Sequence, residues 1–175
     1  MNDSQSNKNK WINLVIVCMG ILISSLDGSI INLANPTLAQ AFKIGIDQVQ
    51  WVVTVYLLVV TALMLFFGRL GDKIGSPTIF NYGFLIFTVG SLFCGVSNSF
   101  ALLILSRVVQ AVGASMLMAT GLGIVATSFP IEQRGQALGL TVVAVGLGNM
   151  GGPSLGGVIL SYLNWHYIFL KNVQV

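Results

Sequence analysis

The sequence contains very few charged residues. Only 7% of its 175 residues are charged, as eight basic and five acidic side chains, whereas 55% are hydrophobic. Soluble domains carry about 25% charged residues, so this chain lacks the polar surface that a soluble domain needs. The composition therefore predicts a protein embedded in a lipid bilayer, and we expect no nucleic-acid partner.

The residues that most often build catalytic and metal sites are also scarce. His166 is the only histidine, and the two cysteines, Cys18 and Cys94, lie inside apolar runs, where a thiol packs as a small apolar side chain. We interpret them as free thiols. The sequence has no GxxxxGK[ST] phosphate-binding loop and no recognisable nucleophile–base pair. We therefore expect a protein that is not an enzyme and that holds no cofactor or metal.

Long apolar stretches fill most of the chain. A membrane-spanning helix needs about 20 apolar residues, and turn-forming clusters are absent within each stretch. Five stretches meet this length, at about 11–35, 50–68, 79–97, 100–127 and 137–160. A sixth begins near residue 165 and stops at Val175. The predicted fold is an all-α integral membrane bundle (11–175) with five complete spans and the start of a sixth, preceded by a polar tail (1–10).

The charged residues between the stretches predict an orientation. The predicted breaks are Lys43–Asp47, Arg69–Lys73, Ser97–Ser99 and Glu132–Arg134. Cytoplasmic loops of membrane proteins are enriched in Lys and Arg. An N-terminus in the cytoplasm places most basic residues inside, namely Lys8, Lys10, Arg69, Lys73 and Arg134, and leaves Lys43 outside. We therefore expect a multi-pass protein of the cell (inner, cytoplasmic) membrane with a cytoplasmic N-terminus.

Asp27 is an ionisable residue inside the first apolar stretch. A charge in hydrocarbon is costly, so such a residue faces the interior of a bundle and is a functional candidate. On a helix, Asp27 lies on a polar face together with Ser24, Ser25, Gly28, Asn32 and Asn35. The opposite face is apolar and consists of Leu22, Leu26, Ile30 and Leu33. We expect the polar face to line a water-filled cavity. Asp27 can carry a proton or attract a cationic substrate. The alternative is a static ion pair that fixes helix packing.

Arg107 is the second ionisable residue inside a span, the fourth. At helical spacing it shares one side with Gln110 and then with small residues that permit close approach of another helix, Ala111, Ala114 and Gly121. Both Asp27 and Arg107 are expected in the outer half of the membrane, where they can pair. The functional interpretation is a coupling site, and the structural one is a packing contact.

Two further segments are rich in glycine. The predicted loop after the second span contains Gly68, Arg69, Asp72, Lys73 and Gly75. Its glycines allow a tight reversal, and Asp72 can pair with an arginine, so this segment can connect two helix bundles. In the fifth span, glycines spaced by four give a face for close packing against another helix. Pro153 weakens the same helix because it removes a backbone hydrogen bond. The segment comprises Gly148, Gly152, Pro153, Gly156 and Gly157. A bend at Pro153 can act as a hinge, but many membrane helices contain proline without such a role, so both interpretations stay open here.

Together these motifs resemble those of the major facilitator superfamily. Gly68–Gly75 is similar to the superfamily's loop motif between the second and third helices, and Leu103–Ser115 to its fourth-helix motif. Gly148–Gly157 resembles the fifth-helix motif of the proton-linked drug antiporters. Leu26–Pro36 resembles the first-helix motif of the fourteen-span drug exporters, and Trp165–Phe169 fits the start of the sixth helix.

This resemblance implies a function as well as a fold. The superfamily is built from six-helix bundles of inverted repeats, and its antiporter branch exports amphipathic, often cationic compounds by alternating access. The resemblance implies Asp27 as the proton or cation carboxylate, Arg107 as its partner, Asp72 as a cytoplasmic latch and Gly152-Pro153 as a pivot. The proton gradient would then be the energy source.

The sequence departs from the superfamily pattern in three places. Ser76 and Pro77 replace the basic pair usual in the loop motif, and Ala111 stands where glycine is usual in the fourth-helix motif. The third departure is length. Relatives have twelve or fourteen spans, and the second bundle is missing from this sequence. That bundle is expected either in the same longer chain or not at all. Two alternatives therefore stay open: a metabolite or ion carrier of the same superfamily, and a truncated fragment that does not transport.

Overall fold

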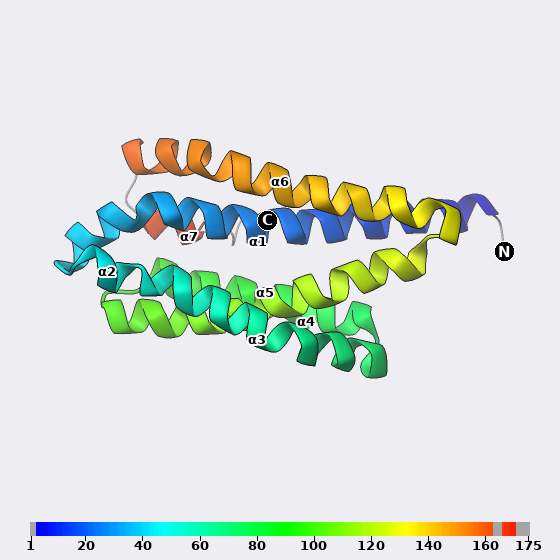
Figure 1. Cartoon of the computed structure of the whole chain (residues 1–175), viewed down its shortest axis with the longest axis horizontal. Coiled ribbons are helices and arrows are strands. Elements are labelled where there is room, and N and C mark those ends of the chain that lie inside the picture. The colour runs from blue at the N-terminus through cyan, green and yellow to red at the C-terminus, as the bar shows by residue number, and fades with distance from the viewer. Residues whose placement is uncertain (1–2, 163–165, 171–175) are drawn as a thin grey trace.

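The computed structural model describes residues 3–162 and 166–170, and all regular secondary structure in these residues is helical. The helices, in chain order, are α1 (Asp3–Phe42), α2 (Ile46–Val49), α3 (Trp51–Ile74), α4 (Ser76–Gly95), α5 (Phe100–Ser128), α6 (Ile131–Tyr162) and α7 (His166–Leu170). The long helices run back and forth along one axis (Figure 1). The predicted all-α fold is confirmed.

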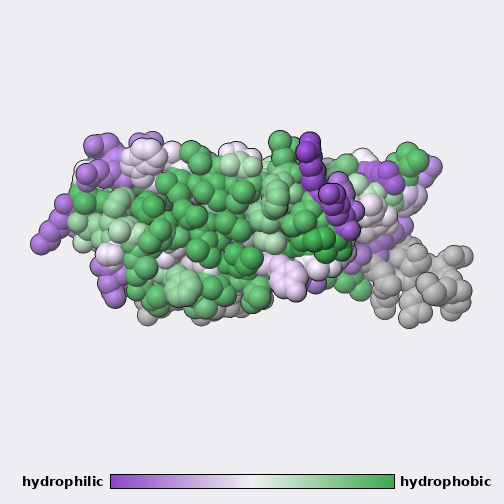
Figure 2. Space-filling view, turned by 90° about the horizontal axis from the view of Figure 1, so that it is seen from below, coloured by the Kyte–Doolittle hydropathy of each residue, from purple (hydrophilic) through white to green (hydrophobic). Residues whose placement is uncertain are grey.

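Five segments of the described chain are long and apolar enough to cross a membrane. They are Lys10–Phe42, Ile46–Ile74, Ser76–Gly95, Phe100–Ser128 and Ile131–Ile159. The space-filling view shows apolar side chains along the middle of the molecule and hydrophilic ones gathered toward its two ends (Figure 2). This distribution fits a bilayer, whose hydrocarbon core is about 30 Å thick.

The helices extend beyond the predicted spans. α1 begins at Asp3, inside the predicted tail, and continues through Pro36 to Phe42. The charged segments Arg69–Lys73 and Glu132–Arg134, predicted as breaks, lie in the last turn or so of α3 and the first turn of α6. Lys, Arg and Glu are good helix formers, and exposed charges do not end a helix when it leaves the apolar region. The connections are correspondingly short.

The turn between α3 and α4 consists of one residue. Gly75 has φ of +108°, a conformation that side chains with a Cβ rarely adopt. Its N–H donates to the carbonyl of Gly71 at 2.9 Å and so ends α3. The predicted tight reversal is therefore present, but it begins at Gly75 and not at Gly68, which lies within the helix.

The predicted sixth stretch begins with α7. Its predicted first residue, Trp165, lies outside the described residues. Ile168 and Phe169 are each 1% exposed and join an apolar cluster with residues of α1, α3 and α5, among them Leu38, Val52 and Leu103. This cluster ties the start of α7 to the end of the bundle opposite the N-terminus.

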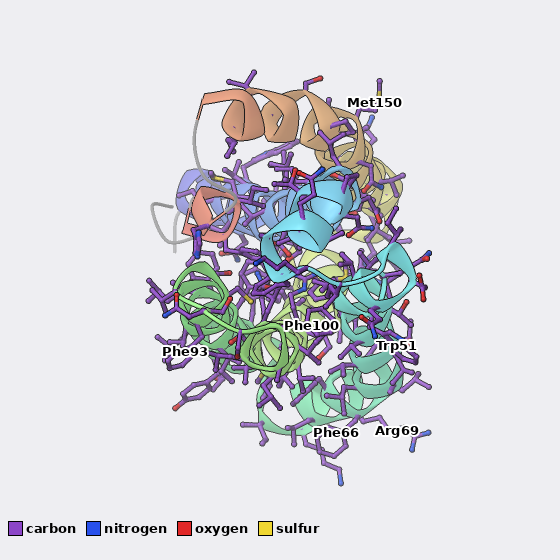
Figure 3. The ribbon with its side chains drawn as sticks, turned by 90° about the vertical axis from the view of Figure 1, so that its left-hand side faces the viewer. Trp51, Phe66, Arg69, Phe93, Phe100 and Met150 are labelled. Carbon is purple, nitrogen blue, oxygen red and sulfur yellow. The ribbon has the colours of Figure 1, made fainter. Side chains whose placement is uncertain are left out.

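Helix α5 occupies the centre of the bundle. It contacts α4 and α3 on one side and α1 on another, and α6 packs along α1 (Figure 1). Seen along the axis, Phe66, Phe93 and Met150 lie on the outside of the bundle (Figure 3); these side chains are 59%, 52% and 78% exposed. The polar and small residues therefore gather inside, where they form the site described below.

Glycines bring α4 and α5 into backbone contact. A Cβ atom on Gly113 would clash with the backbone N of Phe87 and would lie 2.7 Å from the carbonyl oxygen of Gly83. A Cβ on Gly90 would lie 2.5 Å from the backbone N of Gln110. Real Cβ atoms do not approach so closely, so only glycine fits. This contact fixes the separation of α4 and α5 at the height of Gln110.

A second seam of small residues joins α6 to α1. The buried positions of α6 are spaced by three or four residues, from Ala137 through Thr141, Ala144, Gly148 and Gly152 to Gly156. A Cβ on Gly148 would lie 2.6 Å from Cβ of Ser25, and one on Gly152 would clash with Oγ of Ser29. The Ser29 hydroxyl donates to the carbonyl of Gly148 at 3.1 Å. The predicted packing face of these glycines is confirmed.

We expect Gly113→Ala to destabilise the protein, because α4 and α5 must separate to accommodate the methyl group. The cost of such overpacking is about 1–3 kcal/mol. Gly123→Ala on the same helix is the matched control, since a Cβ there meets nothing closer than Oγ of Ser76 at 3.5 Å. Alanine should stabilise that turn slightly. Equal thermal unfolding midpoints of the two variants, measured in detergent, would contradict the backbone contact.

Candidate functional site

The Asp27 carboxylate lies buried near the middle of α1. Its exposed fraction is 0%. Because α1 continues past Pro36, Asp27 lies about four turns from the end of the helix, whereas Arg107 lies about two turns from the start of α5. The two residues are close enough to pair, as the sequence allowed, and their location in the outer half of the membrane stays a prediction.

Asp27 and Arg107 form an ion pair. Nη1 of Arg107 lies 2.6 Å from Oδ2 of Asp27, and both side chains are 0% exposed. It is the single ion pair among the residues whose side chains the structure describes. Removing one partner of such a buried pair typically costs about 3–5 kcal/mol, because the other charge is left without compensation. The two charges thus depend on each other.

Arg107 has further partners on α3 and α5. Its Nε donates to the backbone carbonyl of Val52 at 3.3 Å, and its Nη1 donates to Oε1 of Gln110 at 2.6 Å. Val52 and Gln110 are both buried. Within the described part of the chain, Nη2 of Arg107 makes no hydrogen bond. The guanidinium is therefore held by three helices, with its Nη2 amino group unused.

Gln110 connects the ion pair to α4. Its Nε2 donates to Oδ1 of Asp27 at 3.1 Å and to Oγ of Ser91 at 2.7 Å. The thiol of Cys94, which is a free cysteine as predicted, lies 3.8 Å from Oε1 of Gln110. The close glycine contact between α4 and α5 allows these short distances. Asp27, Arg107 and Gln110 thus form one buried network, which we call the ion-pair cluster.

Tyr56 on α3 covers the guanidinium. Cζ of Arg107 lies 4.1 Å from the centre of the Tyr56 ring and 6.0 Å from that of Phe169. Contacts of a cation with an aromatic face at such distances are attractive. From the sequence alone, Tyr56 is interpreted as an aromatic-belt residue near the end of a span; its 4% exposure corrects this, because it lies inside the bundle. The available signal was its spacing of four from Val52 and from Val60, which places all three on the buried face of α3.

A cavity of about 260 Å³ lies beside the ion-pair cluster, between α1, α3, α5 and α6. Its lining residues are uncharged: Ser24, Ser25, Gly28, Ser29, Asn32, Val53, Tyr56, Leu57, Val60, Met118, Val145 and Asn149. The predicted polar face of α1 therefore does line a cavity. Asp27, however, is not part of the lining, because its side chain turns toward α5 and is fully buried.

The opposite face of α1 is only partly as expected. Leu33 is 41% exposed, but Ile30 is fully buried. Ile30 packs against α6, where its Cγ2 lies 3.0 Å from the position of a Cβ on Gly156. A single-helix projection cannot show this contact, since it depends on where α6 lies.

The charged residues of the segment Gly68–Gly75 lie at the surface of the bundle. Arg69, Asp72 and Lys73 are exposed, and Arg69 points outward in Figure 3. Gly71 is buried, and a Cβ there would lie 2.8 Å from Cγ2 of Thr120. The segment thus packs against α5 through glycine and presents its charges outward. Its latch role stays a prediction.

Pro153 does not end α6. The helix continues to Tyr162, and Pro153 itself is exposed. The hinge function of Gly148–Gly157 stays a prediction, whereas its close packing against α1 is observed. Among the described residues, no group of three or more His, Cys, Asp or Glu side chains lies close enough together to hold a metal ion.

Comparison with known proteins identifies the family. The sequence profile of the Major Facilitator Superfamily matches residues 17–173. The chain is 57% identical over 168 residues to the riboflavin transporter RibZ of Clostridioides difficile, covering 96% of this chain and 37% of RibZ. It is 37% identical over 169 residues to the putative multidrug resistance protein MdtD of Salmonella paratyphi B, covering 97% of this chain and 36% of MdtD. The chain thus spans about a third of these relatives.

A solved structure supports the same fold. The chain resembles a bacterial homologue of the human lysosomal transporter Spinster, crystallised in an inward-facing and unoccupied conformation. The TM-score is 0.74 at 17% sequence identity, and the match covers 94% of this chain and 41% of that one. The chain belongs to the Major Facilitator Superfamily.

Proposed function

We propose that this chain forms the N-terminal bundle of a proton-coupled secondary transporter that exports an amphipathic compound by alternating access. The observation that carries the proposal is the buried Asp27–Arg107 pair. A charged pair inside a membrane bundle is costly and marks ion and proton pathways in transporters. The superfamily membership supports alternating access between two bundles.

Proton binding at Asp27 would change the charge of the cluster. With both groups ionised, the carboxylate and the guanidinium neutralise each other at 2.6 Å. A proton on Asp27 leaves Arg107 as an uncompensated buried cation, which is unfavourable by several kcal/mol. The bundle then favours a conformation in which Arg107 regains water or another partner. The proton gradient supplies the energy for this change, and no cofactor takes part.

The distribution of basic residues supports an N-terminus on the cytoplasmic side of the cell membrane. Lys10, Arg69, Lys73 and Arg134 lie at the end of the bundle that holds the N-terminus, and Lys43 lies at the opposite end. This asymmetry follows the positive-inside rule. In this orientation the turn at Gly75 faces the cytoplasm.

The two glycine segments would serve the motion between bundles. The exposed charges of Arg69, Asp72 and Lys73 are available to a second bundle, so we assign them to a cytoplasmic latch. At Gly148, Gly152 and Gly156, helix α6 meets Ser25, Ser29 and Ile30 of α1 without a side chain of its own. Such a smooth interface lets α6 shift against α1, with Pro153 as the weak point of the helix.

The cavity favours a neutral substrate that makes hydrogen bonds. Its lining offers hydroxyl and amide groups beside apolar ones but no charge, and the Asp27 carboxylate is both buried and paired with Arg107. RibZ, which is 57% identical, is named a riboflavin transporter. We therefore propose a flat amphipathic metabolite of the riboflavin type, with the second bundle completing the site.

Export of cationic amphipathic drugs is the second candidate. It is favoured by the Gly148–Gly157 segment, which resembles the drug-antiporter motif, and by the likeness to MdtD, which is named a putative multidrug resistance protein. Such a substrate would have to reach a carboxylate, and in this structure the Asp27 carboxylate is covered.

We expect Asp27→Asn to abolish transport driven by a pH gradient while leaving membrane insertion intact, because asparagine cannot bind and release a proton. Transport is measured in vesicles containing the polypeptide as its native cells make it. Asp47→Asn is the matched control, since Asp47 is exposed on α2, and it should transport normally.

A static role of the pair predicts a different result. If Asp27 and Arg107 only fixed helix packing, removal of both charges in Asp27→Asn/Arg107→Gln would restore transport, because neither side chain would leave a buried charge behind. Restored pH-driven transport in the double variant would therefore contradict the coupling role.

We expect riboflavin to be transported in preference to tetraphenylphosphonium, a permanent amphipathic cation. Asn149→Leu should raise the KM for riboflavin about fivefold, which corresponds to one lost hydrogen bond of ~1 kcal/mol. Met150→Leu is the control, because the adjacent Met150 is 78% exposed and lies on the outside of the bundle (Figure 3). Transport of the cation alone would favour the drug-export candidate instead.

A further inference from the structure

Tyr56 separates the cavity from the ion-pair cluster. It lines the cavity, while its ring lies 4.1 Å from Cζ of Arg107. Arg107 and Asp27 themselves have no exposed surface and are not among the lining residues. On this side, access from the cavity to the guanidinium therefore depends on the position of one aromatic ring.

The Tyr56 hydroxyl has no hydrogen-bond partner in the described part of the chain, although it is buried. An unsatisfied buried hydroxyl is rare, and such groups are normally paired with protein, ligand or water. Tyr56 shares the cavity with further polar side chains, those of Ser24, Ser25, Asn32 and Asn149. The hydroxyl is thus available to the same ligand that these groups contact.

We propose that Tyr56 is a positioning residue that links the cavity to the proton site: its hydroxyl donates to a hydrogen-bond acceptor of the neutral ligand, and its ring shields the Asp27–Arg107 pair. This inference rests on the proposed function and deepens it. A ligand that engages the hydroxyl holds the ring in place or draws it toward the cavity. In the second case the ion pair becomes open to water and protons.

Few other groups near the pair can titrate. Arg107 on α5 faces Asp27 directly, the Tyr56 ring on α3 lies over Arg107, and Cys94 on α4 lies against Gln110 of the cluster. α6 contributes the uncharged Asn149 to the cavity. His166 lies at the start of the short helix α7 and is half-buried. The effect of a Tyr56 substitution on the access of protons to the pair is therefore measured at the Asp27 carboxyl group.

The shielding role can be tested without a known substrate. Dicyclohexylcarbodiimide, an apolar reagent, modifies protonated carboxyl groups, and mass spectrometry of the peptide that contains Asp27 gives the rate. The experiment uses membranes containing the native polypeptide, at one mildly acidic pH. We expect Tyr56→Ala to raise the rate roughly 2- to 30-fold, the range expected for loss of a cation–π contact. Tyr56→Phe keeps the ring and should match the wild type.

Val60→Ala is the matched control for a general loosening of the cavity wall. Val60 lines the same cavity one turn along α3, and it is not part of the cluster. An unchanged rate in Tyr56→Ala, or an equal rise in Val60→Ala, would overturn the shielding role. If Tyr56→Ala fails to insert, Tyr56→Leu retains apolar bulk without an aromatic face and is expected to raise the rate as well.

The role of the hydroxyl is tested by transport of riboflavin. Tyr56→Phe should raise the KM about fivefold and leave the maximal rate and its pH profile unchanged, whereas Tyr56→Ala should alter the pH profile. An unchanged KM in Tyr56→Phe would overturn the hydroxyl contact. Failure of the proposed function gives a different pattern, because transport would then persist in Asp27→Asn whatever the behaviour of the Tyr56 variants.

Discussion

The buried ion pair between Asp27 and Arg107 constrains the rest of the bundle. Neither charge is tolerable alone among apolar helices, so α1 and α5 must bring the two groups within hydrogen-bonding distance. Further hydrogen bonds to the pair come from α3 and α5, through the carbonyl of Val52 and the amide of Gln110. The site is thus a condition of folding as well as a candidate for function.

Glycines allow the helices to pack closely around the ion pair at two interfaces, one between α4 and α5 and the other between α1 and α6. Between α4 and α5, Gly90 and Gly113 bring backbone against backbone and place Gln110 within 2.7 Å of the Ser91 hydroxyl. Between α1 and α6, Gly148 and Gly152 accept the serines of α1. The first interface positions Gln110 within the cluster. The second is the interface at which the proposed motion of α6 would take place.

Charge and binding surface are kept apart in this bundle. The cavity has an uncharged lining of hydroxyl, amide and apolar groups, and the charges lie behind it with no exposed surface. Because both groups are buried, neutralising Asp27 would leave Arg107 as a lone buried charge, which is unfavourable. The neutral lining is what supports the proposal of a neutral ligand. Tyr56 is in contact with both regions, and that position gives it a role that its residue type alone does not suggest.

The sequence by itself determined the all-α membrane fold, since apolar length and scarce charge leave no other solution, and it singled out Asp27, Arg107 and Gln110 as buried polar residues. Only the tertiary structure decided that Asp27 turns away from the cavity and that Tyr56 covers Arg107. It also decided that Ile30 packs against α6. A helical projection gives the angle of a side chain about its own axis, but its neighbours depend on the rotation and depth of the other helices, which are set by contacts distant in sequence.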